Sequence, residues 1–188
     1  MENILLGAVG LTWAIVELTL RVRDRVRGKG GTEGDRGTRR FSGALLMAAV
    51  VGAWVLSAVA GRHSPLRVPG LEAAGVVVLF AGVVTRVWAV ATLGRSFRTT
   101  VEVDVGQAVV TSGPYRWVRH PSYTGLLLAA LGLGLGFGTW PGLVLCAVLP
   151  VVGLWRRIEV EEAEMTRVLG DAYEAYKGRT KRLVPGLW

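Results

Sequence analysis

Long apolar stretches alternate with short polar ones along most of the chain. A stretch of about 20 mostly apolar residues is enough to cross a bilayer as a helix. Four stretches meet this length, namely Asn3–Leu20, Phe41–Ala60, Leu71–Gly94 and Ser122–Trp140. A fifth, Pro141–Trp155, is shorter and follows the fourth after a turn predicted at Thr139–Gly142. The pattern predicts an all-α integral membrane protein with five transmembrane helices.

The first apolar stretch is expected to be retained as a span. It lacks a basic start and leads to no small-residue cleavage site, unlike a signal peptide. It contains Glu17, and the third stretch contains Arg86. An ionisable residue inside a span is a functional candidate by default and needs a partner nearby. A structural Arg86–Glu17 pair is therefore expected.

The charged sequence after the fifth stretch predicts a cytoplasmic C-terminal helical segment. Apolar or aromatic residues recur across Arg156–Lys177 at spacings of seven, four, three and four, which is typical of one helix face. Gly170 and Asp171 predict a break in this helix. Period-two alternation over Thr99–Val105 is compatible with a strand, but a short extended loop is expected there. Arg27–Arg40 is rich in glycine and charge and predicts a flexible loop.

Glycines occupy every second position from Gly132 to Gly138, which predicts close helix packing in lipid. No Gly-x-Gly-x-x-Gly sequence is present, so a nucleotide-like cofactor would bind without a Rossmann domain. We expect residues 1–188 to form a single domain. Its N-terminal part, residues 1–69, would hold two spans, and residues 70–188 would hold three spans with the C-terminal helix.

Basic residues concentrate in alternate connections, which sets the expected orientation. They are frequent in Arg21–Arg40, in Arg95–Arg119 and after Arg156, whereas the connection after the second span has only Arg62 and Arg67. The positive-inside rule then places the amino terminus outside and the carboxyl terminus in the cytoplasm. A composition rich in Ala, Gly, Val and Arg suggests a bacterial source, and hence the inner membrane.

The net charge of +8 fits attraction to membrane lipids with anionic headgroups. No nucleic-acid-binding module is visible, so no nucleic-acid partner is expected. The single cysteine, Cys146, lies in an apolar run and predicts neither a disulfide nor a metal site.

The segment Gly113–Gly125 combines basic, aromatic and backbone-restricting residues next to a span. Pro121 favours a helix start and pushes His120 out of the helical region, so His120 is expected at the amino end of the fourth span. That end of a helix favours an anionic ligand group. Basic side chains that would add donors are Arg116 and Arg119. Flat faces suited to an aromatic base or a sulfonium cation are offered by Tyr115, Trp117 and Tyr123. A plain basic-aromatic membrane boundary is the alternative.

A second polar cluster follows the last span. Arg157 and Glu161 are four residues apart and share a helix face. They could organise reacting groups, or they could form an ordinary solvated ion pair.

These segments resemble the isoprenylcysteine carboxyl methyltransferase family, and the membrane phospholipid methyltransferases share a similar carboxyl-terminal half. The matching segments are Leu93–Arg95, Val110–Arg116, Arg119–Gly125, Arg157–Glu162, Gly170–Tyr176 and Arg182–Pro185. The resemblance extends from Val87 to Pro185. At Phe97 this sequence departs from the family, where Trp is more usual.

The resemblance implies an integral membrane enzyme that binds S-adenosylmethionine in a cytosol-facing pocket formed by the last spans and the C-terminal helix. A lipophilic or prenylated substrate would reach the pocket from the bilayer. The implied cofactor-binding residues are Gly113, Tyr115, Arg119, His120, Pro121, Tyr123, Gly125, Glu162 and Tyr173. The catalytic candidates are Arg157, Glu161 and Arg86.

The chemistry of the acceptor decides the role of each candidate. A carboxylate arrives ionised and needs no base, so Arg157 and Arg86 would hold it. An amine or thiol must lose a proton, for which Glu161 or His120 would be the base. Carboxyl O-methylation of an isoprenylcysteine-like substrate is expected. Phospholipid amine N-methylation and small-thiol S-methylation are alternatives, as is a non-catalytic membrane binding protein with the same fold. A transporter is disfavoured because the ionisable groups gather at one face.

Overall fold

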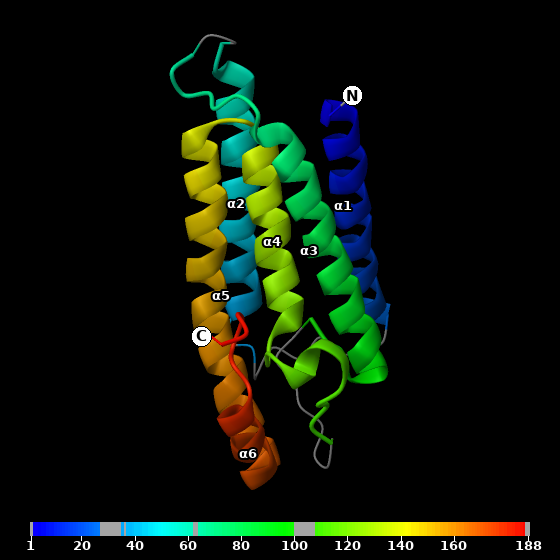
Figure 1. The fold of residues 1–188 in the computed structure, drawn as a ribbon. Helices are drawn as coiled ribbons and strands as arrows, with labels where there is room; N and C mark the ends of the chain where they lie inside the picture. Colours follow the sequence, from blue (N-terminus) through cyan, green and yellow to red (C-terminus); the bar gives the residue numbers. More distant parts are fainter. Residues whose placement is uncertain (1, 27–34, 36, 62–63, 100–107, 187–188) are drawn as a thin grey trace.

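The computed structural model describes residues 2–26, 35, 37–61, 64–99 and 108–186, and in this part of the chain the regular elements are helical. Five long helices lie side by side (Figure 1). They are α1 (Glu2–Val26), α2 (Thr38–Val59), α3 (Leu71–Leu93), α4 (Pro121–Gly136) and α5 (Trp140–Leu169). A short helix, α6 (Asp171–Arg179), and two 3₁₀ turns, η1 (Gly94–Ser96) and η2 (Gly113–Arg116), complete the regular elements.

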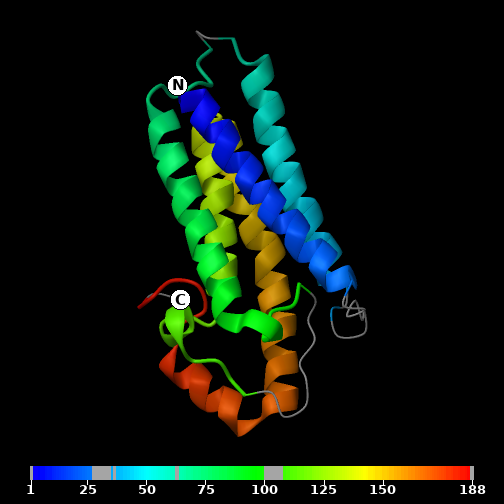
Figure 2. The same ribbon diagram turned by 90° about the vertical axis from the view of Figure 1, so that its right-hand side faces the viewer.

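Helices α1, α2 and α3 are each long and apolar enough to cross a membrane, and α4 is a shorter apolar helix. Helix α5 is continuous over 30 residues and carries both the short fifth apolar stretch and the charged stretch that follows it. It ends at Leu169 with Gly170 as its cap, and α6 begins at Asp171, which confirms the predicted break. The charged half of α5 and α6 extend beyond the bundle (Figure 2).

Two sequence predictions about boundaries were wrong. The fourth span was expected to reach Trp140, but α4 ends at Gly136 and the turn comes earlier, with Gly138 at a φ of 68°. Trp140 instead begins α5, because Pro141 suits the first turn of a helix. The loop predicted over Arg27–Arg40 is also too long, since α2 already begins at Thr38. Of the alternating segment Thr99–Val105, only its first residue lies within the described part.

Glycines bring α3 and α4 into backbone contact, which confirms close packing along this part of the fourth span. A Cβ on Gly132 would lie 2.3 Å from the amide nitrogen of Leu79, and one on Gly125 would lie 2.6 Å from that of Arg86. Both positions therefore exclude any larger residue without separation of the helices. The contact at Gly125 fixes the backbone of Arg86 against the start of α4.

The predicted intramembrane pair between α1 and α3 is present. Arg86 Nε donates to Glu17 Oε1 at 2.7 Å, and Nη2 donates to the other carboxylate oxygen at 3.1 Å. Arg86 Nη1 also donates to the Ser122 carbonyl at 3.2 Å and to the Ser122 hydroxyl. Arg86 therefore connects the first helix to the amino end of α4.

The C-terminal segment returns to the start of α4 (Figure 2). The Arg119 amide donates to the Lys181 carbonyl at 2.7 Å, and the His120 amide donates to the Arg182 carbonyl at 3.0 Å. These bonds accompany a parallel bridge between Val118 and Lys181. The sequence predicted a helix after the last span, but it gave no sign of this pairing, which joins residues about 60 positions apart.

Candidate active site

A cavity of about 170 Å³ lies where α4, α5 and α6 meet the polar ends of α1, α2 and α3. One part of its lining is polar and aromatic and comes from η2, the start of α4 with its cap residue, the charged half of α5 and α6. This lining includes Tyr115, His120, Tyr123, Glu161 and Tyr173. The other part lies further inside the bundle and is apolar. It includes Leu46, Leu126 and Leu154. The cavity thus combines a polar part with an apolar part that can hold a hydrocarbon chain.

The Tyr123 hydroxyl is the meeting point of the Arg157 and Glu161 side chains. Arg157 Nε donates to the Tyr123 oxygen at 2.6 Å, and the Tyr123 hydroxyl donates to Glu161 Oε2 at 2.5 Å. The His120 ring stacks on Tyr123 with 5.5 Å between ring centroids and 13° between planes. The shared helix face predicted for the two charged residues is therefore organised around a tyrosine of α4. Arg157 is only 5% exposed, so it is not part of a solvated surface pair.

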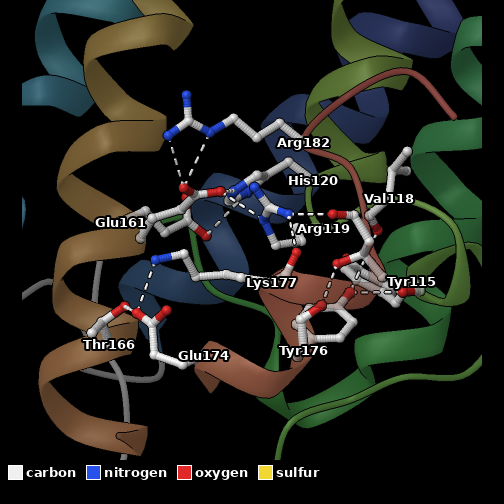
Figure 3. Close-up of polar contacts among 12 residues, drawn as sticks. Tyr115, Val118, Arg119, His120, Glu161, Thr166, Glu174, Tyr176, Lys177 and Arg182 are labelled. Carbon is white, nitrogen blue, oxygen red and sulfur yellow. Dashed lines mark hydrogen bonds and ion pairs between the residues drawn. The ribbon is translucent and has the colours of Figure 1, made fainter. Parts of the chain in front are cut away.

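Two arginines and a histidine gather on the carboxylate of Glu162, a buried residue of α5. Arg119 Nε donates to it at 2.8 Å, Arg182 Nε donates at 3.1 Å, and His120 Nε2 lies 3.2 Å away. Figure 3 shows Arg119, His120 and Arg182 converging next to α5. Burial raises the pKa of Glu162, but hydrogen bonds with His120 and Arg119 outweigh it and lower the pKa to about 2. Glu162 is therefore ionised and fastens the C-terminal segment to the start of α4.

Buried tyrosines supply neutral aromatic surfaces around this cluster. Burial raises the pKa of Tyr115 and Tyr173 well above the ordinary value, and it raises that of Tyr176 to about 12. Their hydroxyls stay protonated at physiological pH. The Tyr176 hydroxyl donates to the Tyr115 carbonyl at 2.7 Å, as Figure 3 shows. Tyr115 and Tyr173 both line the cavity, where they suit an uncharged aromatic ligand group.

The structure brings most of the residues singled out from the sequence to one place. Eight line the cavity, namely Arg86, Tyr115, Arg119, His120, Tyr123, Arg157, Glu161 and Tyr173. The other four are described but lie outside its lining, namely Gly113, Pro121, Gly125 and Glu162. Pro121 starts α4, Gly125 packs on the α3 backbone, and Gly113 turns the chain at a φ of 56°. Their positions fit support of the cavity walls.

Two amides in the first turn of α4 have partners within the helix. The amides of Tyr123 and Thr124 both donate to the His120 carbonyl, at 3.0 and 3.1 Å. These donors are therefore engaged within the helix. Arginine side chains, among them Arg86, Arg119 and Arg157, add positive charge to the cavity lining.

Two polar contacts of Arg157 could not be anticipated from the sequence. Its Nη1 donates to Asp35 Oδ1 at 3.3 Å, and its Nη2 donates to the Thr99 carbonyl at 2.6 Å. Asp35 followed by Thr38 before an apolar run is a helix-start signal. That signal locates the beginning of α2 but says nothing of Arg157.

A membrane-embedded helical bundle with a cationic and aromatic cavity at one end defines the class of protein, and comparison with known sequences gives its family. The profile of the phospholipid methyltransferase family matches residues 71–172. The chain belongs to this family, and within it the resemblance to isoprenylcysteine carboxyl methyltransferases is confirmed.

Curated relatives carry the name protein-S-isoprenylcysteine O-methyltransferase. The one from Schizosaccharomyces pombe is 32% identical over 111 residues, covering 50% of this chain and 45% of the relative. The one from Rattus norvegicus is 30% identical over 125 residues, covering 63% and 43%. A probable one from Oryza sativa subsp. indica is 33% identical over 121 residues, covering 59% of each. The chain thus spans about half the length of these relatives.

A solved structure of a eukaryotic intramembrane Ras methyltransferase, isoprenylcysteine carboxyl methyltransferase, is also similar. It is 26% identical in sequence, with a TM-score of 0.65, and the match covers 74% of this chain and 52% of that one. Together with the apolar helices, this likeness supports an integral membrane protein. The matched family region begins at Leu71, so Glu17 and Asp35 lie outside it.

Proposed function

We propose that the protein is an S-adenosylmethionine-dependent membrane methyltransferase that O-methylates the carboxylate of an isoprenylcysteine-like lipophilic substrate. The observation that carries the proposal is the two-part cavity. Its polar part contains the Tyr123–Arg157–Glu161 contact, and its apolar part contains Leu46, Leu126 and Leu154. Such a cavity suits a reaction between a water-soluble reactant and a lipid-dissolved one.

The residues at the polar part fit S-adenosylmethionine, which would supply a methyl group on a sulfonium centre. Tyr115, Tyr123 and Tyr173 present aromatic faces, which bind a flat base or a cation. Glu161 adds a negative charge that favours a cationic ligand. Arg119 would favour the carboxylate of the cofactor. These residues would hold and orient the cofactor and exclude water from it.

The charge of the cavity lining favours an anionic acceptor. Among the described residues, six arginines contribute to it, namely Arg21, Arg39, Arg86, Arg98, Arg119 and Arg157, whereas the carboxylates are Glu17 and Glu161. A carboxylate needs no general base, so its activation consists of positioning and removal of water. We assign this positioning to Arg157, with Arg86 holding the wall formed by α1 and α4. The apolar residues would hold the hydrocarbon chain, which reaches them from the bilayer.

Methylation of a phospholipid amine is the second candidate, favoured by the family profile that matches the chain. An amine must lose a proton during transfer, and the carboxylate of Glu161 lies in the cavity where a base would act. A small thiol would need the same base. Transfer of a labelled methyl group distinguishes these reactions, because a carboxylate acceptor gives a methyl ester and an amine or a thiol does not.

We further propose five spans within a single domain, two in residues 1–69 and three in residues 70–188. The amino terminus would lie outside a bacterial inner membrane, and the C-terminal segment with α6 would be cytoplasmic. Cysteines introduced at Gly61 and Gly178, where a side chain meets no atom within 4 Å, test this topology. A membrane-impermeant thiol reagent should label the first in intact spheroplasts and the second only after permeabilisation. Labelling of the second in intact spheroplasts would contradict the orientation.

We expect removal of the stacked rings of His120 and Tyr123 to lower the affinity for S-adenosylmethionine. Combined replacement His120→Ala and Tyr123→Ala should weaken S-adenosylmethionine binding by roughly tenfold or more, about 1.4 kcal/mol. Titration calorimetry in detergent measures this change. Glu159→Gln serves as the control, because Glu159 is exposed on another face of α5. Equal affinity of wild type and double variant would remove these residues from the cofactor site.

A further inference from the structure

Asp35 is a buried carboxylate that the proposed reaction has not used. It is 6% exposed and precedes α2. Its Oδ2 accepts a hydrogen bond from the Arg39 amide at 3.0 Å, and its Oδ1 accepts one from the Thr38 hydroxyl at 3.1 Å. The same Oδ1 lies 3.3 Å from Arg157 Nη1. One carboxylate therefore caps the start of α2 and pairs with the arginine of the cavity.

The three polar contacts of Arg157 come from three separate parts of the chain. Its Nε meets Tyr123 of α4, its Nη1 meets Asp35, and its Nη2 meets the Thr99 carbonyl. A guanidinium carries five N–H groups in one rigid plane. Contacts on all three nitrogens fix that plane, and among the described residues they use three of its five donors. The side chain is thus held in a fixed orientation while N–H groups remain to donate to a carboxylate of the substrate.

We propose that Asp35 is a positioning residue that acts through Arg157 to align the acceptor carboxylate. This inference rests on the proposed function and deepens it. Asp35 lies in the two-span part, outside the matched family region 71–172. The N-terminal part of the chain would therefore contribute to turnover as well as to anchoring, because a carboxylate just before α2 holds the arginine on α5 in place.

Asp35→Asn tests the proposal with little change in shape. The amide oxygen can still accept a bond at the start of α2, but the charge facing Arg157 is lost. Turnover of an S-prenylated cysteine derivative should fall by about tenfold in kcat, while S-adenosylmethionine affinity stays within about twofold. In an Arg157→Gln background, the same replacement should change kcat by less than about twofold, because linked residues are not additive. An equal loss in both backgrounds, or no loss in either, would overturn the proposal.

Thr38→Val separates positioning from helix capping. This replacement removes a hydroxyl that donates to the carbonyl and to the carboxylate of Asp35, and it leaves Arg157 unchanged. Thermal stability should decrease, since two hydrogen bonds that hold Asp35 at the start of α2 are lost, while kcat stays within about twofold of wild type. A tenfold loss of kcat in this variant would show that capping of α2, and not the charge of Asp35, controls turnover.

A readout independent of turnover keeps this inference distinct from the proposed function. In protein labelled with ¹⁵N-arginine, the Arg157 Nε resonance is the one missing in Arg157→Gln. It should shift in Asp35→Asn and stay in place in Thr38→Val. An unshifted resonance in Asp35→Asn would refute the link. If the resonance shifts in Asp35→Asn but the wild-type protein transfers no methyl group, the link between Asp35 and Arg157 is supported and the proposed function is rejected.

Discussion

Replacement of Arg157 by lysine, or of Glu161 by glutamine, is expected to lower kcat/KM for methyl transfer by roughly 100-fold or more, about 2.7 kcal/mol of barrier. The reason is their shared contact at the Tyr123 hydroxyl, at 2.6 and 2.5 Å. Lysine keeps the charge beside Asp35 but loses the planar fork that orients a carboxylate. Glutamine at position 161 keeps the shape but removes the negative charge. Steady-state kinetics with purified protein in lipid nanodiscs measures both effects.

Glu159→Gln is the matched control on the same helix. Its carboxylate accepts a bond from the Trp155 indole at 2.8 Å and is exposed. Its replacement should leave kcat/KM within about twofold of wild type, since an exposed polar contact contributes little. Comparable thermal stability of all three variants would exclude unfolding as the cause. If the Arg157 and Glu161 variants keep the activity of the Glu159 variant, the catalytic assignment fails.

Replacement of Glu162 by glutamine is expected to destabilise the fold more than any other single exchange of a charged α5 residue. Glu162 is ionised and binds Arg119, His120 and Arg182, and its side chain is 6% exposed. Removal of its charge leaves the buried guanidinium of Arg119 without its ionic partner, which costs about 3–5 kcal/mol. The thermal midpoint in detergent should fall by roughly 6–20 °C.

The loss should depend on pH in a defined direction. The pKa of Glu162 is lowered from 4.5 to about 2 in the folded protein. A group whose pKa is lowered by folding stabilises the protein above the pKa that it has in the unfolded chain. This stabilisation is lost as the pH falls through the pKa that it has in the folded protein. This contribution amounts to about 3 kcal/mol at neutral pH. The difference between wild type and Glu162→Gln should therefore shrink as the pH is lowered from about 6 to about 3.

Glu164→Gln on the same helix is the control for this experiment. Glu164 pairs with Arg167, whose side chain is 70% exposed, so its replacement should cost less than about 1 kcal/mol. A stability loss in Glu162→Gln as small as in the control would contradict the role of Glu162. A difference that stays constant from about pH 6 to about pH 3 would contradict its lowered pKa.

The apolar pattern predicted the helical bundle because each long helix must present hydrocarbon to lipid. The Arg86–Glu17 pair was also predictable, since a charge inside a span requires a partner. The end of α4 was not, because Phe137 and Trp140 are as apolar as the helix itself. There the turn depends on the positive φ of Gly138, which hydropathy does not report.

The motif before α4 and the charged half of α5 predicted residues that meet in space, because both flank the polar end of the bundle. Tyr123 as the bridge between Arg157 and Glu161 could not be derived from helix spacing, which relates residues only within α5. The Asp35 and Thr99 contacts depend on tertiary packing across 122 and 58 residues of sequence.

The most direct measurement of the central claim is methyl transfer from S-adenosylmethionine carrying a labelled methyl group. Purified protein in lipid nanodiscs would be offered an S-prenylated cysteine, a phosphatidylethanolamine and a small thiol in parallel. We expect the label in a base-labile ester of the prenylated cysteine. This product should be lost in Glu161→Gln and retained in Glu159→Gln. Absence of labelled product from all three acceptors, in protein that retains its fold, would contradict it.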